Sequence, residues 1–256
     1  MTDLLASGDK VVHAPHPPLH RYYGEDGDRP RWVQHMFNDT AADYDRTEFM
    51  IGLGSGSWYR REALLRAGLA AGMTVLDVGI GTGLVARRAA EIVGDAALVT
   101  GLDPSAGMLQ NARLPAGVTL VEGYAEEIPF PDASFDFLSM GYALRHISDL
   151  SRAFSEFCRV LKPGGRLCIL EITRPESRVF EILLRGYMRG VVPALARFTS
   201  KKTDTPRMWS YYWDTIAACA SAANIMHTLA DSGFGEVDRH LELKIFSEYR
   251  ARKPNP

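Results

Sequence analysis

The chain has 256 residues, of which 46% are hydrophobic and 23% are charged, and its formal net charge at pH 7 is −2. A chain of this length can bury one substantial core. The near-zero charge provides no general basic surface, which excludes nucleic acid as the expected partner. The cysteines lie far apart and lack metal-binding spacing, so neither a disulfide nor a metal is expected (Cys158, Cys168, Cys219).

The N-terminal segment has neither a basic region nor an apolar stretch typical of a signal peptide, and no apolar run reaches about 18 residues. The expected compartment is therefore the cytoplasm. Residues 1–30 are rich in Pro, His, Gly and Asp, and we interpret them as a flexible arm before a single domain, 31–256. The arm's histidines lack the spacing of metal ligands.

Helical periodicity begins near Arg31 and continues to Leu69, with a glycine-rich break at residues 52–56. This pattern predicts two N-terminal helices. The short basic pairs Arg60-Arg61 and Lys201-Lys202 are expected on solvated faces.

From Thr74 onward, short β-branched apolar runs alternate with helical stretches. Strands separated by helices pair in parallel through right-handed crossovers. The last two strands are joined too tightly for a helix and must form an antiparallel hairpin at the sheet edge. The pattern predicts an α/β fold with a doubly wound, Rossmann-like, seven-stranded and mostly parallel sheet, with strands at 74–78, 97–102, 118–122, 135–140, 166–171, 236–243 and 244–250 and intervening helices at 84–93, 105–113, 150–161 and 222–232. The long stretch between the fifth and sixth strands predicts a helical lid insertion at about 172–220.

A glycine-rich turn follows the first strand, in the run Val75-Leu76-Asp77-Val78-Gly79-Ile80-Gly81-Thr82-Gly83. Glycine lets the backbone turn sharply and approach a ligand where a Cβ would clash. Leu84 stands where the dinucleotide fingerprint requires a small residue, which argues against NAD. Asp103 ends the second strand, where a carboxylate can accept both hydroxyls of an adenosine ribose.

Three further segments, 122–131, 134–137 and 161–166, complete an ordered set with this turn and Asp103. The set resembles the class I methyltransferases that bind S-adenosylmethionine. The resemblance implies that Gly79, Gly81 and Gly83 approach the methionine moiety, that Asp103 holds the ribose and that Met108 covers one adenine face. It also places Tyr124 and Ala125 at the adenine edge, with Asp77 and Gly141 in the same site. Tyr124 departs from the usual Asp or Asn, so stacking and backbone donors would hold adenine here.

The loop after the fourth strand contains Arg145 and His146 beside the expected methyl donor. An arginine can hold a phenolate or polarise a water, and a histidine can accept a proton. The alternative is a surface pair that caps the next helix.

The segments 37–45 and 144–149 and the lid resemble the ubiquinone/menaquinone biosynthesis C-methyltransferases, over about Val33 to Arg250. That resemblance implies catalytic roles for Tyr44 and Arg145, with the arginine and its neighbour activating a water that deprotonates a quinol. The chain departs from the pattern at His146, which replaces an asparagine. It departs again at 54–57, which lack a His-Arg pair, and at 217–221, which lack a His-Pro motif.

These patterns predict C-methylation of a small aromatic or quinol-like acceptor. O- or N-methylation of a secondary metabolite, with His146 as base, and binding of S-adenosylmethionine without turnover remain alternatives. A cluster of aromatic side chains is compatible with an acceptor pocket or with helix core (Tyr187, Trp209, Tyr211, Tyr212, Trp213). Contact with a membrane that holds a lipidic acceptor is a further alternative, although no dominant basic amphipathic face is visible. The sequence leaves the oligomeric state open, and a dimer is compatible with it.

Overall fold

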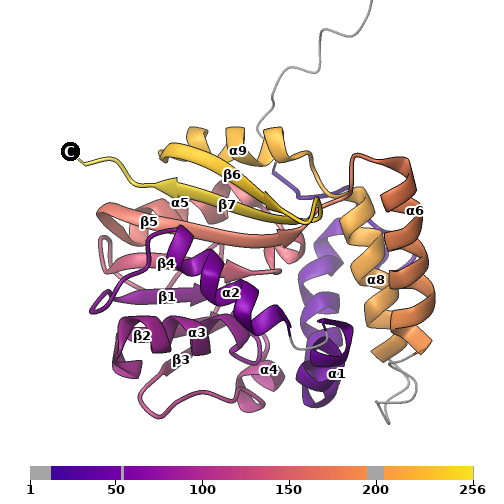
Figure 1. The fold of residues 1–256 in the computed structure, drawn as a ribbon, viewed down its shortest axis with the longest axis horizontal. Helices are drawn as coiled ribbons and strands as arrows, with labels where there is room; N and C mark the ends of the chain where they lie inside the picture. Colours follow the sequence, from indigo (N-terminus) through magenta and orange to yellow (C-terminus); the bar gives the residue numbers. More distant parts are fainter. Residues whose placement is uncertain (1–12, 53–54, 195–204, 256) are drawn as a thin grey trace, which may run out of the picture.

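The computed structural model describes residues 13–52, 55–194 and 205–255. A seven-stranded sheet with the order β3-β2-β1-β4-β5-β7-β6 runs through the middle (Figure 1). β1 to β5 pair in parallel, and β7 is antiparallel to both β5 and β6. The strands are β1 (Val75–Val78), β2 (Val99–Asp103), β3 (Thr119–Glu122), β4 (Phe135–Gly141), β5 (Leu161–Ile172), β6 (Gly235–Glu242) and β7 (Phe246–Arg252). The predicted fold class and the terminal hairpin are confirmed.

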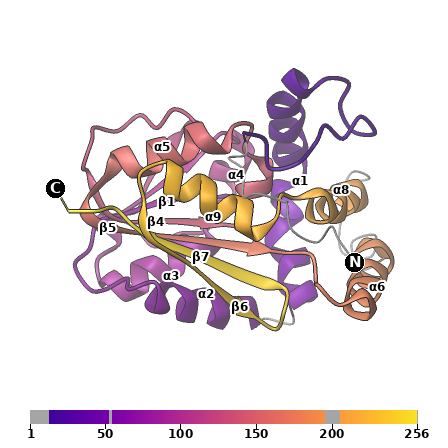
Figure 2. The ribbon, with the colours of Figure 1, turned by 90° about the horizontal axis from the view of Figure 1, so that it is seen from above.

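Helices cover both faces of the sheet, with α5 and α9 on one side and α2 and α3 on the other (Figure 2). The α-helices are α1 (Arg29–Gly52), α2 (Ser55–Arg66), α3 (Leu84–Val93), α4 (Ala106–Gln110), α5 (Leu150–Val160), α6 (Arg178–Gly186), α8 (Thr205–Ala218) and α9 (Ala222–Asp231). Shorter turns are η1 (Asp26–Asp28), η2 (Ala96–Leu98), η3 (Leu144–His146) and the π-helical η4 (Tyr187–Val191). α1, α6 and α8 stand together at the end of the sheet where β5 terminates (Figures 1 and 2).

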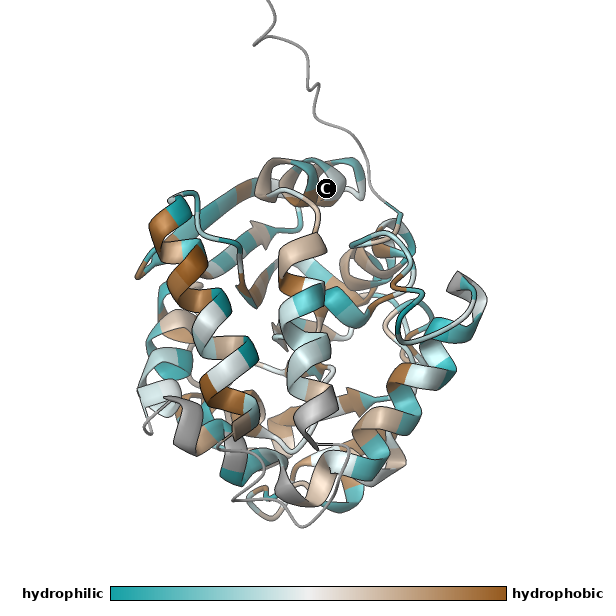
Figure 3. Cartoon of the chain, turned by 90° about the vertical axis from the view of Figure 1, so that its right-hand side faces the viewer, coloured by the Kyte–Doolittle hydropathy of each residue, from teal (hydrophilic) through white to brown (hydrophobic). Residues whose placement is uncertain are grey.

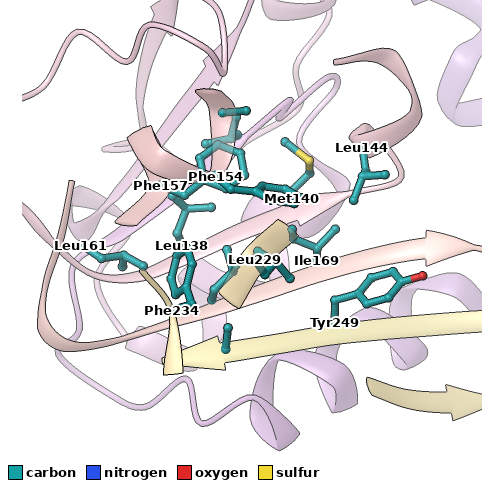
Figure 4. Packing of buried hydrophobic residues seen from close by; sticks show 14 of the residues in the cluster. Leu138, Met140, Leu144, Phe154, Phe157, Leu161, Ile169, Leu229, Phe234 and Tyr249 are labelled. Atoms are coloured by element: carbon teal, nitrogen blue, oxygen red, sulfur yellow. The ribbon is translucent and has the colours of Figure 1, made fainter. Parts of the chain in front are cut away.

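Each face of the sheet has its own apolar core. The core under α5 and α9 includes Leu138 and Met140 of β4, Phe154 and Phe157 of α5, and Leu229 of α9 (Figure 4). Burying one such side chain contributes about 1.5–3 kcal/mol. The second core, under α2 and α3, contains Cys168 as a buried apolar side chain. The two cores hold the strand ends rigidly in place.

One helix is shorter than its sequence pattern indicates. The expected helix at 105–113 is confined to α4, Ala106–Gln110. The Ser105 side chain accepts a hydrogen bond from the Met108 N–H and so starts the helix one residue later. The chain then leaves the helix at Asn111, four residues before Pro115, whose ring would clash with the Asn111 carbonyl if the helix continued.

The segment preceding α1 packs more closely than a flexible arm. His16 is 2% exposed, and its Nε2 lies 2.9 Å from Nη2 of Arg29. The backbone oxygens of His13 and Pro15 accept hydrogen bonds from Leu150 and Ala220. The polar composition of this segment gave no sign of core packing, but its aromatic residues Tyr22 and Tyr23 are buried against α8 side chains. The expectation of an arm is therefore wrong for residues 13–28, and residues 1–12 lie outside the described part of the chain.

Within the described ranges, no helix has both the length and the hydropathy needed to cross a bilayer.

Candidate active site

A pocket opens where β1, β2 and β4 end, and α1 covers it from the other side. Its empty volume is about 1060 Å³, including the part open to solvent. Strand order reverses between β1 and β4, and open α/β sheets bind ligands outside the carboxyl ends of their strands at such a point. Of the twelve residues predicted for the cofactor and catalytic sites, nine line it: Tyr44, Gly79, Gly81, Asp103, Met108, Tyr124, Ala125, Gly141 and His146.

The glycine turn forms one wall of the pocket. Gly79 and Gly81 adopt φ of 66° and 56°, in the left-handed region that side chains disfavour. A Cβ at Gly79 would lie 2.6 Å from Cβ of Ala143, whereas one at Gly81 would meet no protein atom within 4 Å. The space beside Gly81 is therefore free for a ligand.

Asp103 presents its carboxylate at the end of β2. One oxygen accepts from the Gly81 N–H and the other from the Ser105 N–H, both at 2.8 Å. Burial raises the pKa of Asp103 to about 6, and these two N–H donors oppose the shift. Each carboxylate oxygen has a second lone pair, so the group can still accept two hydroxyls.

Asp77 and Gly83 do not line the pocket. Asp77 lies in β1, where its Oδ1 accepts from Oγ of Ser139 at 2.7 Å. Gly83 precedes α3 with φ of 91°, and a Cβ there would lie 2.5 Å from Cδ2 of Leu114. Both residues shape the wall from behind.

Three polar side chains of α1 hold this helix against the loops that follow β1 and β2. Gln34 donates to the Pro104 carbonyl at 2.5 Å, and Asn38 accepts from the Gly107 N–H at 2.8 Å. Asp45 accepts a hydrogen bond from the Thr82 hydroxyl. The sequence pattern did not reveal these contacts, because the partners lie 37 to 70 positions apart in the chain.

Aromatic side chains form the other half of the pocket. The hydroxyls of Tyr44 and Tyr212 lie 2.8 Å apart. Phe37 packs against His146 at a ring distance of 5.1 Å. Of the aromatic cluster expected in the lid, Tyr212 lines the pocket, while Trp209, Tyr211 and Trp213 are buried in the core behind it. The two interpretations of the cluster thus apply to different members.

His146 contributes an uncompensated polar atom to the aromatic half. Its Nδ1 lies 3.4 Å from the Tyr211 hydroxyl, and its buried Nε2 has no hydrogen-bond partner among the described residues. Burial, followed by the charges of Arg145 and Arg29, holds the pKa of His146 well below its usual 6.5. The imidazole is therefore neutral near pH 7.

Arg145 does not reach the pocket, although it precedes His146 in η3. Its side chain is fully buried, and its Nε donates to Oε1 of Glu171 at 2.8 Å. Its Nη1 donates to the Thr215 hydroxyl at 2.8 Å and to the Tyr212 carbonyl at 3.2 Å. Arg145 thus ties β5 to α8 and positions Tyr212.

The prediction that Arg60 lies on a solvated face is wrong. Its side chain is 4% exposed and lines the pocket. Its Nη2 donates to Oε1 of Glu48 at 2.6 Å, and its guanidinium lies 5.3 Å from the centre of the Tyr142 ring. The Glu48–Arg60 pair joins two separate helices, so its spacing gives no signal in the sequence. The other expected surface pair, Lys201-Lys202, lies outside the described residues.

In the described ranges, no group of His, Cys, Asp and Glu side chains is arranged to hold a metal ion.

The sheet order, the glycine turn and the pocket at the strand ends define a Rossmann-like methyltransferase fold. A crystal structure of a SAM-dependent methyltransferase from Aquifex aeolicus matches it with a TM-score of 0.57 and 21% identity, over 81% of this chain and 97% of that chain.

The model of the ubiE/COQ5 methyltransferase family matches residues 25–244. The chain belongs to this family and is a methyltransferase, and membership implies S-adenosylmethionine as the methyl donor. A demethylmenaquinone methyltransferase of Renibacterium salmoninarum is 32% identical over 88% of this chain and 93% of its own length. A ubiquinone/menaquinone biosynthesis C-methyltransferase of Coxiella burnetii is 30% identical over 81% of this chain and 85% of its own length.

Proposed function

We propose that the chain transfers a methyl group from S-adenosylmethionine to a ring carbon of a small, apolar, quinol-like acceptor. The observation that carries the proposal is a single pocket with two unlike halves. One half consists of backbone turns and the Asp103 carboxylate, and the other consists of aromatic side chains with the neutral His146. The names of the related enzymes support a quinone-type acceptor.

The cofactor half suits an adenosine attached to a methionine. Asp103 has lone pairs for two ribose hydroxyls, and the free space beside Gly81 lets a ligand approach the backbone. Met108 is buried at the wall and offers an apolar surface to adenine, and Tyr124 is exposed enough to stack on a ring. Ala125 and Gly141 complete the wall. Bound here, S-adenosylmethionine supplies an electrophilic methyl group.

The chain's own contribution is to orient the acceptor and to exclude water. Orientation can lower a barrier by ~7–11 kcal/mol in favourable cases. Phe37, Tyr44 and Tyr212 provide flat apolar surfaces for an aromatic ring. A ring carbon becomes more nucleophilic when a ring hydroxyl loses its proton, so the site must favour the acceptor's anion.

His146 is placed to donate a hydrogen bond to that anion. Nδ1 of His146 lies 3.4 Å from the Tyr211 hydroxyl, which can donate its proton to that nitrogen. The imidazole proton then resides on Nε2, the atom without a partner. Because its pKa is low, His146 is a weak proton acceptor. This arrangement favours C-methylation over O- or N-methylation with His146 as base.

Positive charge in the wall favours an anionic acceptor as well. Arg60 lines the pocket, and Arg145 lies behind Tyr212 with its guanidinium 4.9 Å from the centre of that ring. Charges held in a buried site interact more strongly than in water. Arg145 therefore acts as a positioning residue, and Arg60 is the cation that can approach the acceptor.

The test is incubation of the chain with a demethylated quinol and S-adenosylmethionine carrying a deuterated methyl group. Mass spectrometry should show one labelled methyl in the product. A C-methylated quinol keeps both hydroxyls and can be oxidised to a quinone, whereas an O-methylated one cannot. A labelled product that resists oxidation would contradict C-methylation. Tight cofactor binding without turnover on any quinol would favour a non-catalytic role.

A further inference from the structure

The outward face of α6 and η4 exposes large apolar side chains. Val179, Leu183 and Ile182 are 66%, 62% and 58% exposed. Phe180 and Val191 continue this surface along the helix. Figure 3 views the molecule from the side that carries α6 and shows hydrophobic residues along its outer helices. We call this set, with Leu243 at the β6–β7 turn, the outer lid face.

α6 and η4 are apolar on two sides. Leu184, Met188 and Val192, at i, i+4 and i+8, belong to the cluster beneath the lid, which also contains α8 side chains. Val179, Ile182 and Leu183 follow the i, i+3, i+4 spacing of the opposite side. The inner side explains the packing of the lid. The outer lid face belongs to none of the apolar clusters formed by the described residues.

Cationic side chains flank the outer lid face. Arg178 and Arg185 precede and follow its apolar residues, and neither forms an ion pair with any described residue. The Lys244 ammonium lies 5.8 Å from the centre of the Phe180 ring, which places the β6–β7 turn beside α6. The acidic side chain on this helix, Glu181, is paired with Arg174 at 2.9 Å.

We propose that the outer lid face docks on an anionic phospholipid bilayer. An apolar helix face bordered by cations inserts between headgroups, where the cations meet lipid phosphates. A second copy of the chain fits less well, because a two-fold contact brings the cations of both copies to the same patch.

Docking in this way has a consequence for the acceptor. The inner side of the same lid packs on the cluster that includes Phe37, Tyr44 and Tyr212, all of which line the acceptor half of the pocket. Docking would therefore hold the acceptor half of the pocket close to a bilayer in which an apolar acceptor dissolves. This consequence rests on the proposed function, whereas docking itself does not.

The experiment measures binding of the full chain to vesicles of phosphatidylcholine, with and without phosphatidylglycerol. We expect binding to the anionic vesicles. The pair Ile182→Ser and Leu183→Ser should weaken it by at least about tenfold. The pair Arg178→Gln and Arg185→Gln should weaken it about fivefold per cation and reduce the preference for anionic lipid to what Lys244 alone provides. Leu120→Ser is the control, because Leu120 is exposed on β3 at the opposite edge of the sheet.

Methylation of a short-chain acceptor in solution is measured for the same variants and should not change. Failure of the wild-type chain to bind anionic vesicles, or equal binding by the serine pair, would overturn docking. So would a dimer in sedimentation velocity that the serine pair dissociates, because the face would then be an interface between copies. Vesicle binding with no methylation of any quinol would leave docking intact and defeat the proposed function.

Discussion

The two halves of the pocket are built differently. The cofactor half comes mainly from backbone turns at the ends of β1 and β2, and its contacts are N–H groups and one carboxylate. The acceptor half comes from side chains on α1, α2, α8 and the η3 turn, which only tertiary packing brings together. A local turn tolerates change in distant elements, whereas an assembled wall depends on all of them. We therefore expect substitutions in the two halves to separate cofactor binding from turnover.

The largest expected effect breaks the cofactor half alone. Gly81→Val places a branched side chain in the pocket at φ of 56° and should weaken S-adenosylmethionine binding by at least roughly 100-fold, measured by titration calorimetry. Gly94→Val is the matched control. Gly94 is also left-handed, with φ of 84° and no atom near its would-be Cβ, but it lies at the end of α3. It should lower stability and leave affinity unchanged. Normal binding by the Gly81 variant would remove the glycine turn from the cofactor site.

The next effect concerns the support of the acceptor half. Arg145→Ala leaves the buried Glu171 carboxylate without its ion pair and should cost about 3–5 kcal/mol of unfolding free energy, measured by denaturant titration. Any folded fraction should bind cofactor normally. The double variant Arg145→Met with Glu171→Leu should recover most of the stability, because no buried charge is left unpaired. Turnover should stay low in the double variant, since the Thr215 hydroxyl loses the Arg145 donor and the Tyr212 carbonyl keeps only the Thr215 hydroxyl of these two side-chain donors. Full recovery of turnover would limit Arg145 to a structural role.

A third substitution tests what His146 does. His146→Ala should lower kcat about 100-fold by removing a donor to the acceptor anion. His146→Gln keeps a neutral N–H donor and should retain turnover within about tenfold of the wild type. If His146 were a general base, both variants should lose turnover to a similar extent, since neither alanine nor glutamine can accept the proton. Equal losses of kcat in the two variants, together with a pH-dependent step in kcat that only the wild type shows, would indicate that His146 is the general base.

The difference between the halves also explains how far the sequence predicts the site. The fold and the cofactor half follow from local signals, since the glycine turn and Asp103 each sit at the end of an apolar strand. The sequence did not predict Arg60 as a residue of the pocket wall, because its partner Glu48 lies on another helix. Arg145 was expected at the pocket wall, but its pairing with Glu171, 26 residues further on, turns it away. Burial and long-range pairing decide which polar side chains face a ligand, and neither has a local pattern.

The smallest expected effect concerns Asp77, which lies behind the cofactor half and does not line the pocket. Burial is the main cause that raises the pKa of Asp77 to about 7, against the hydrogen bonds from Ser139 and the Ala86 N–H, and the charge of Asp103 adds to the rise. The native state therefore binds more protons than the unfolded state between about pH 4 and pH 7, and the ionised form costs stability above that range.

Asp77→Asn removes this cost. At pH 8 it should raise the unfolding free energy by about 2 kcal/mol, and the gain should disappear near pH 4, where Asp77 is protonated in the folded wild-type chain. Asp136→Asn is the opposite control. Burial tends to raise the pKa of Asp136, but hydrogen bonds from Thr74 and Lys162 lower it overall, so its loss should destabilise the chain at neutral pH and matter less in acid. If Asp77→Asn instead lost stability at pH 8, the ionised carboxylate would be stabilised in the folded state, and the wall behind the glycine turn would be polar rather than apolar.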